Sequence, residues 1–162
     1  MQADGATVVL FKNNNKKEVF LVFRSDYPVW VTTGGAMEDG ETPKEAAMRE
    51  AKEETGLDIK VTRYMGKYLI TKGNKFRNSY LFEGRVLGGK FRPEFPGCRG
   101  AWFPVDNLPA SMLSRNKEKI HDCLKNFKKP FEKEAPPISL RTDFLLVFLH
   151  PLAAIKYLLK GI

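Results

Sequence analysis

The chain has 162 residues, of which 43% are hydrophobic, 12% aromatic and 28% charged. These proportions exclude a disordered chain, a collagen-like repeat and a heptad rod, and the length predicts one domain with at most an appendage. The formal net charge of +8 favours an anionic partner, such as nucleic acid, nucleotide phosphates or a membrane surface, without choosing among them.

Two cysteines, Cys98 and Cys123, are too few for a disulfide framework and lack the spacing of a metal site. The N-terminal residues lack the basic and then apolar pattern of a secretory signal. Both features predict a cytoplasmic protein with reduced thiols.

The chain begins with a predicted hairpin. Residues 6–12 and 18–24 are rich in β-branched and aromatic side chains, and the polar, Asn-rich link between them is typical of a turn. A third short strand over residues 29–33 leads into a pair of glycines, Gly34 and Gly35. There the alternating pattern of a strand gives way to a helical pattern.

A helix is predicted to begin near Pro43, because proline suits the first helical position. Thr42 and Glu45 have the spacing of a capping box, and Gly56 stands where a left-handed residue ends a helix. The later predicted elements are strands over 57–71, 76–86 and 101–105 and a helix over 116–126. Strands and helices mix without regular βαβ alternation, which predicts an α+β fold with a mixed sheet.

The C-terminal segment over residues 139–162 is apolar and follows residues 128–137, which have the composition of a linker. We therefore predict one domain over residues 1–129, and a linker with an apolar helical extension over residues 130–162. The longest apolar run in the extension is too short for a transmembrane helix. The extension is expected to pack on the domain or on a second subunit of a homodimer, and contact with a membrane surface is the alternative.

Three glutamates gather near the end of the predicted first helix. Because an α-helix turns by about 100° per residue, Glu50, Glu53 and Glu54 share one face. Like charges at these spacings repel one another, whereas a hard divalent cation would join them. Arg49 can orient Glu53 by a charge-assisted hydrogen bond. The alternative is a solvated acidic face on a surface helix.

The residues around this helix resemble the signature of the Nudix hydrolases. The fixed positions of that signature are filled by Gly35, Glu41, Arg49, Glu50, Ala51, Glu53, Glu54, Gly56 and Leu57. Ala51 replaces a larger aliphatic residue, and Thr33 stands where proline is frequent, but neither change removes a ligand. The signature covers 23 residues, and the resemblance in element order extends over residues 5–127.

The resemblance implies an α/β/α sandwich with a mixed β-sheet, in which a catalytic loop-helix-loop segment holds Mg²⁺, or alternatively Mn²⁺. The implied metal ligands are the carbonyl of Gly35 and the carboxylates of Glu50, Glu53 and Glu54. Arg49 is implied as a catalytic organiser together with Glu41. The implied reaction is attack of water on a phosphorus of a diphosphate attached to a group X.

Two carboxylates are candidates for the general base. Glu53 is the first choice, because it belongs to the signature. Glu94 is the second choice and lies in a later loop, where the alternative is a solvated bystander.

Basic and aromatic side chains are candidates for substrate binding. Arg24 and Arg77 are expected to attract phosphates, and Trp30 and Tyr80 are expected to stack on a nucleobase. For the basic residues of this region the alternative is protection of sheet edges, and for each aromatic side chain it is packing in the core.

Together these features predict Mg²⁺-dependent hydrolysis of a pyrophosphate bond in a nucleoside diphosphate linked to X. A nucleoside triphosphate is favoured because the domain is short. The proline that marks ADP-ribose-selective members of the family is absent, since none lies between Pro43 and Pro93. A Nudix scaffold that binds a nucleotide or RNA without cleaving it is the alternative, although the complete carboxylate set argues against it. A membrane-proximal enzyme acting on a lipid pyrophosphate rests on the C-terminal segment alone.

Overall fold

The computed structural model describes residues 3–72 and 75–136. These ranges contain eight strands and two helices. In chain order they are β1 (Gly5–Phe11), β2 (Glu18–Phe23), β3 (Trp30–Val31), β4 (Thr33–Ala36), α1 (Pro43–Thr55), β5 (Asp58–Lys72), β6 (Lys75–Gly88), β7 (Arg99–Pro104), α2 (Ser114–Leu124) and β8 (Phe131–Glu134).

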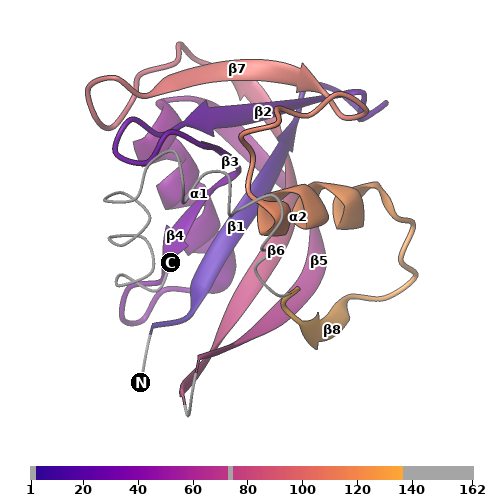
Figure 1. Ribbon diagram of the computed structural model, residues 1–162. Helices are drawn as coiled ribbons and strands as arrows, with labels where there is room; N and C mark the ends of the chain where they lie inside the picture. Colours follow the sequence, from indigo (N-terminus) through magenta and orange to yellow (C-terminus); the bar gives the residue numbers. More distant parts are fainter. Residues whose placement is uncertain (1–2, 73–74, 137–162) are drawn as a thin grey trace.

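One mixed sheet organises the molecule, with strand order β3-β2-β1-β6-β5-β8 (Figure 1). Strand β1 lies at its centre. It runs parallel to β6, and it pairs antiparallel with β2 near its end and with β4 near its beginning. Every residue of β1 is buried. The sequence GATVVLF is almost continuously apolar because both of its faces are covered.

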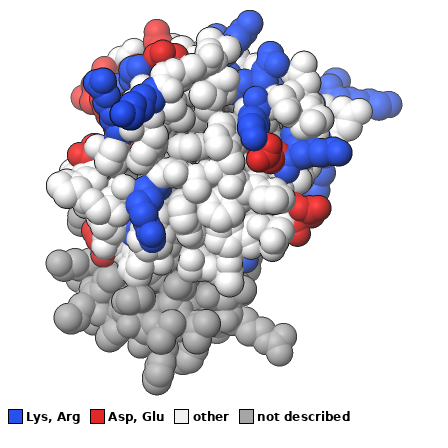
Figure 2. All heavy atoms as spheres, turned by 90° about the horizontal axis from the view of Figure 1, so that it is seen from above, with Lys and Arg blue, Asp and Glu red and all other residues white. Residues whose placement is uncertain are grey.

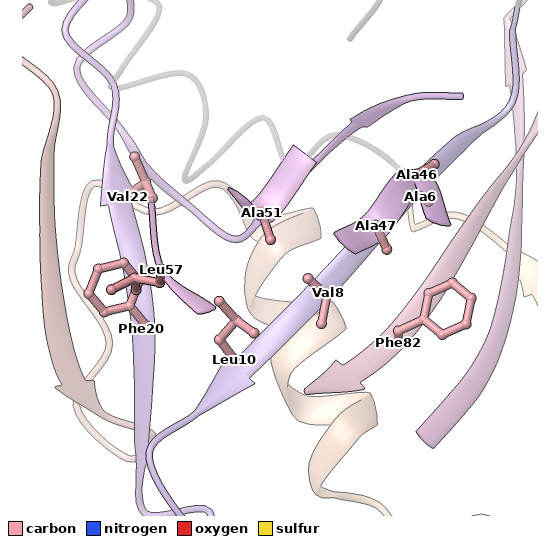
Figure 3. Packing of buried hydrophobic residues seen from close by; sticks show 10 residues of the cluster. All are labelled: Ala6, Val8, Leu10, Phe20, Val22, Ala46, Ala47, Ala51, Leu57 and Phe82. Carbon is pink, nitrogen blue, oxygen red and sulfur yellow. The ribbon is translucent and has the colours of Figure 1, made fainter. Parts of the chain in front are cut away.

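The two helices cover opposite faces of this sheet. On one face, Ala46, Ala47 and Ala51 of α1 pack over Val8 and other side chains of β1 and β2 (Figure 3). These small alanines allow the helix to approach the sheet closely. On the other face, alternate residues of β1 pack against α2 through Ile120. The arrangement confirms the predicted α+β sandwich with a mixed sheet.

Helix α2 is tied to the far edge of the sheet by a buried carboxylate. Asp122 accepts a hydrogen bond from the hydroxyl of Tyr68 on β5. It also lies 2.6 Å from Lys133 Nζ on β8 and 2.8 Å from Lys125 Nζ. A buried carboxylate held by two cations and a hydroxyl fixes α2 in one position over the sheet.

The predicted hairpin and first helix are confirmed. The capping box of Thr42 and Glu45 is present, and Gly56 ends the helix with a positive φ of 69°. Two predictions were wrong. The glycine pair before α1 belongs to strand β4, and β8 lies within the predicted linker, where it pairs with β5. Local composition did not reveal either strand, because each forms only by pairing with a distant one.

The second predicted helix begins two residues earlier than expected and ends at Leu124. Within the described ranges, no helix is long and apolar enough to cross a membrane. The apolar C-terminal segment lies outside the described residues, so its predicted contacts with the domain, a second subunit or a membrane stay predictions.

Candidate active site

The candidate site lies where α1 meets β4. Gly35 faces Glu50 so closely that a Cβ on this glycine would lie 2.5 Å from both carboxylate oxygens. The neighbouring Gly34 has a φ of 148°, and its N–H donates to Glu54 Oε2 at 3.0 Å. The glycine pair therefore lets the backbone of β4 approach two glutamates on successive turns of the helix.

Arg49 fixes the loop between β4 and α1. Its guanidinium donates to both carboxylate oxygens of Glu41, at 2.9 and 3.1 Å, and to the carbonyl of Ala36 at 3.0 Å. Its third nitrogen reaches Glu50 at 3.0 Å and Glu53 at 3.1 Å. The hydrogen bonds that Arg49 donates to Glu41 lower the pKa of Glu41 and raise the pKa of Arg49. Bidentate pairing of this kind gives rigid geometry.

The side chains of Glu50 and Glu54 are largely covered by the protein, whereas that of Glu53 is exposed to solvent. Burial raises the pKa of Glu54 to about 8, and the negative charges of Glu50 and Glu94 add to the shift. Burial also raises the pKa of Glu50, against the opposing effect of Arg49. The side chain of Glu53 is 51% exposed, at the surface beside Arg49. The three glutamates predicted to act together are thus divided between the interior and the surface.

A divalent cation fits this donor set. Within residues 3–72 and 75–136, no three His, Cys, Asp or Glu side chains are grouped closely enough to hold a metal ion as they stand. However, the carboxylate of Glu50 lies against Gly35 and that of Glu54 accepts from the N–H of Gly34, and burial and repulsion by neighbouring carboxylates penalise their charge. A hard cation would remove that penalty, because oxygen ligands suit Mg²⁺ and Mn²⁺.

A cavity of about 620 Å³ extends from these glutamates across the sheet to α2. Glu50, Glu54 and Glu94 are among its lining residues, and we call these three residues the acidic wall. We call the cations Arg77, Arg115 and Lys119, which also line the cavity, the basic wall. Apolar side chains, including Val31 and Leu113, complete the lining. The volume is in the range of small-molecule sites.

The structure brings together only some of the predicted substrate-binding residues. Arg24 and Arg77 line the cavity. Arg24 forms two hydrogen bonds with Asp26, at 2.7 and 3.0 Å, and its charge acts on Glu54. Among the described residues, Trp30 and Tyr80 are not part of the lining.

Packing accounts for the positions of these two aromatic side chains. Trp30 packs against Phe23 and Phe103, with ring centroids 5.4 and 4.7 Å away. Tyr80 lies beside Tyr64 and packs on the core under α1. Their predicted stacking on a nucleobase therefore has no support from their placement.

Residues of α2 reach the cavity without having been predicted to do so. Lys119 Nζ donates to Thr7 Oγ1 at 2.8 Å, and Asn116 Oδ1 accepts from Thr32 Oγ1 at 2.7 Å. The sequence SRNKEK at the start of this helix reads as a solvated polar turn. No local signal identified it, because the placement of α2 depends on contacts far apart in sequence.

The NUDIX domain model matches residues 1–124, which include the glycine pair, α1 and all of α2. The chain belongs to the Nudix hydrolase family. A protein of Bacillus subtilis (strain 168) named "Putative 8-oxo-dGTP diphosphatase" is 33% identical over 124 residues, which are 75% of this chain and 80% of that protein. Diphosphoinositol polyphosphate phosphohydrolase 3-alpha of Mus musculus is 38% identical over 78 residues, 48% of this chain and 47% of that protein.

Solved Nudix structures share the fold. The crystal structure of an ADP-ribose pyrophosphatase from Streptococcus suis superposes with a TM-score of 0.64 at 23% identity, over 83% of this chain and 99% of that chain. A NUDIX hydrolase from Nitrosomonas europaea gives a TM-score of 0.65 at 23% identity, over 81% and 94% of the two chains. At this identity the likeness concerns the fold alone. The Nudix signature itself forms the loop and α1 segment that carries Glu50 and Glu54.

Proposed function

We propose that this Nudix protein hydrolyses a pyrophosphate bond in a nucleoside diphosphate linked to a group X, with Mg²⁺ or Mn²⁺, and prefers nucleoside triphosphates. The observation that carries the proposal is the cavity itself. Its lining combines two half-buried carboxylates, a close backbone and several cations. Such a site suits a metal-bound polyphosphate, because the cation meets the carboxylates and the phosphates meet the basic groups.

Glu50, Glu54 and the carbonyl of Gly35 would hold the metal. A bound divalent cation supplies charge neutralisation to the diphosphate and lowers the pKa of water. Arg49 would act as a positioning residue, since it fixes Glu41, Glu50 and the carbonyl of Ala36 in one network. Arg24 lines the cavity and would attract a substrate phosphate.

The placement of Glu94 supports it as the general base over Glu53. Glu94 lines the cavity, and its charge contributes to the raised pKa of Glu50 and of Glu54. Glu53 lies at the surface, where its carboxylate is bound by Arg49. A base must come within hydrogen-bond reach of the water it activates, and Glu94 lies on the side of the cavity where the metal ligands stand.

The names of the relatives support phosphoanhydride chemistry and a nucleotide substrate. They include 8-oxo-dGTP, diphosphoinositol polyphosphate and NAD-capped RNA as compounds acted on. All three contain a phosphoanhydride bond. The surface agrees with an anionic substrate, because Lys and Arg outnumber Asp and Glu on the face shown in Figure 2 and the net charge is +8.

A substrate panel tests the proposal. Purified protein is incubated with Mg²⁺ and nucleoside triphosphates, nucleotide sugars and capped RNA, and the products are identified by phosphorus NMR. We expect hydrolysis of at least one triphosphate. Glu54→Gln should lose more than about a hundredfold in rate, because loss of even an outer partner of a metal ligand costs 10–100-fold. Asp39→Asn, an exposed change in the preceding loop, is the matched control and should keep the native rate.

The same panel distinguishes a hydrolase from the alternative, a Nudix scaffold that binds a nucleotide without cleaving it. A Nudix scaffold that only binds would retain a nucleotide in equilibrium dialysis and release no product. Equal product formation by the native chain and by Glu54→Gln would show that the reaction does not belong to this site, and the proposed function would be wrong.

A further inference from the structure

The basic wall lines the same cavity as the residues that would hold the metal. Lys119 comes from α2, and its ammonium donates to Thr7 Oγ1 on the central strand at 2.8 Å. Arg115 lies one helical turn earlier, and its Nε donates to the carbonyl of Pro136 at 3.0 Å. Arg77 comes from β6, and its guanidinium lies near Gly5. Two separate elements, α2 and β6, therefore bring three cations to the lining of one cavity.

The charge of Lys119 is unbalanced by the protein. Among the residues that the structure describes, no carboxylate lies within ion-pair distance of its ammonium. Burial, together with the positive charges of Arg77 and Arg115, lowers the pKa of Lys119 to about 8. A buried cation is costly unless an anion accompanies it. The cavity thus places a desolvated ammonium where a negative group of a ligand would relieve the cost.

The two walls are close enough for one compact ligand to reach both. The carboxylate of Glu54 acts electrostatically on Lys119 across the cavity and opposes the lowering of its pKa. A Cβ on Gly5 would lie 3.7 Å from the guanidinium of Arg77 and 3.1 Å from the carbonyl oxygen of Gly35. An anion bound by the basic wall would therefore sit near the phosphates held at the acidic wall.

We propose that Lys119, with Arg115 and Arg77, binds a negatively charged group of X beyond the scissile diphosphate, so that this enzyme selects substrates in which X is anionic. The inference rests on the proposed function and deepens it. In a nucleoside triphosphate, X is the third phosphate. In a nucleotide sugar, X is a neutral sugar and leaves Lys119 without a counter-charge. The basic wall is thus the specificity determinant between these two substrate classes.

Steady-state kinetics on two substrates test the selection. For Lys119→Met, the KM for a nucleoside triphosphate should rise by about tenfold, the usual effect of losing one hydrogen bond to a charged group. The KM for UDP-glucose should change by less than about threefold, and Lys119→Arg, which keeps the charge, should retain the triphosphate preference. Lys117→Met is the matched control, since this lysine of α2 is not among the described lining residues. Equal effects on both substrates would overturn the inference.

A binding measurement separates this inference from the proposed function. Calorimetry with inorganic tripolyphosphate in EDTA reports on anion binding without metal and without hydrolysis. The native chain should bind it about tenfold more tightly than Lys119→Met and no more tightly than Lys117→Met. Lys119-dependent binding in a chain that hydrolyses no nucleotide would support the anion site and refute the enzymatic function. Identical binding by the native chain and Lys119→Met would refute the anion site, whatever the enzyme hydrolyses.

Discussion

The acidic and basic walls of the cavity are built in different ways. In the acidic wall, Glu50 and Glu54 are held by contacts that are short in sequence. Arg49 reaches Glu41 across eight residues, and Gly34 reaches Glu54 across 20. The basic wall depends on α2, whose Lys119 reaches Thr7 across 112 residues. A single helix and its preceding loop can position Glu50 and Glu54, whereas the basic wall exists only when the whole sheet has formed.

The two walls also differ in how their charges are compensated. On the acidic side, Arg49 forms ion pairs with Glu41, Glu50 and Glu53 at the same time. On the basic side, the hydroxyl of Thr7 is the partner of Lys119. The comparison teaches that the acidic wall is organised before a substrate arrives, while the basic wall holds a charge that a substrate would complete.

The largest effect should come from removing the general base of the acidic wall. Glu94→Gln is expected to lower kcat by about 10²–10⁴-fold, because a positioned base contributes that much to a rate. Glu53→Gln is expected to have a smaller effect, since Glu53 lies at the surface beside Arg49. Single-turnover hydrolysis with Mg²⁺ saturating measures both variants.

Glu132→Gln provides a control for this pair, because Glu132 is an exposed glutamate of β8 whose partner is Lys67. It should hydrolyse at the native rate. A larger loss for Glu53→Gln than for Glu94→Gln would move the base to the signature helix, and it would mean that Glu53 leaves Arg49 when substrate binds.

An intermediate effect should follow from filling the space between β4 and α1. In Gly35→Ala the new Cβ would lie 2.5 Å from the oxygens of Glu50, so the carboxylate must move. We expect a loss of about 10–100-fold in Mg²⁺ or Mn²⁺ affinity, the usual effect of disturbing a ligand's support, with little change in unfolding temperature. Titration of Mn²⁺ followed by electron paramagnetic resonance measures the affinity.

Gly88→Ala is the matched control, because a Cβ on Gly88 would meet no atom within 4 Å. It should bind Mn²⁺ as the native chain does. Unchanged affinity in Gly35→Ala would show that Glu50 is free to move without loss, and the acidic wall would then be less rigid than its contacts indicate.

The difference between the walls also explains what could be predicted from the sequence. The capping box, the glycine pair and the carboxylates of α1 lie within about two dozen consecutive residues, so their spacing carries the information. The division of Glu53 from Glu50 and Glu54 was not predictable, since the backbone approach at Gly35 decides which carboxylates are enclosed. The sequence did not indicate that Lys119 lines the cavity, because a lysine on a polar helix is usually solvated.

Strand β8 shows the same limit in the fold. The sequence FEKE has linker composition, yet it pairs with β5 over Gly66–Leu69 and Phe131–Glu134. Gly66 makes this possible, because a Cβ there would collide with the backbone of Phe131. The pairing depends on two segments that meet only in the folded chain, so composition alone could not indicate it.

The smallest effect concerns how the free energy of unfolding of the metal-free protein depends on pH. Glu54 of the acidic wall and Lys119 of the basic wall both titrate near pH 8. The folded pKa of Glu54 is about 8 against an ordinary 4.5, so the folded state keeps a proton that the unfolded chain loses, and stability falls from pH 4.5 to 8. Lys119 has a folded pKa of about 8 against 10.5, so the unfolded chain keeps the proton longer, and stability rises from pH 8 to 10.5. Urea unfolding in EDTA should show a minimum near pH 8. Glu54→Gln should remove the fall and Lys119→Met the rise, whereas a native profile in both variants would mean that neither charge is desolvated.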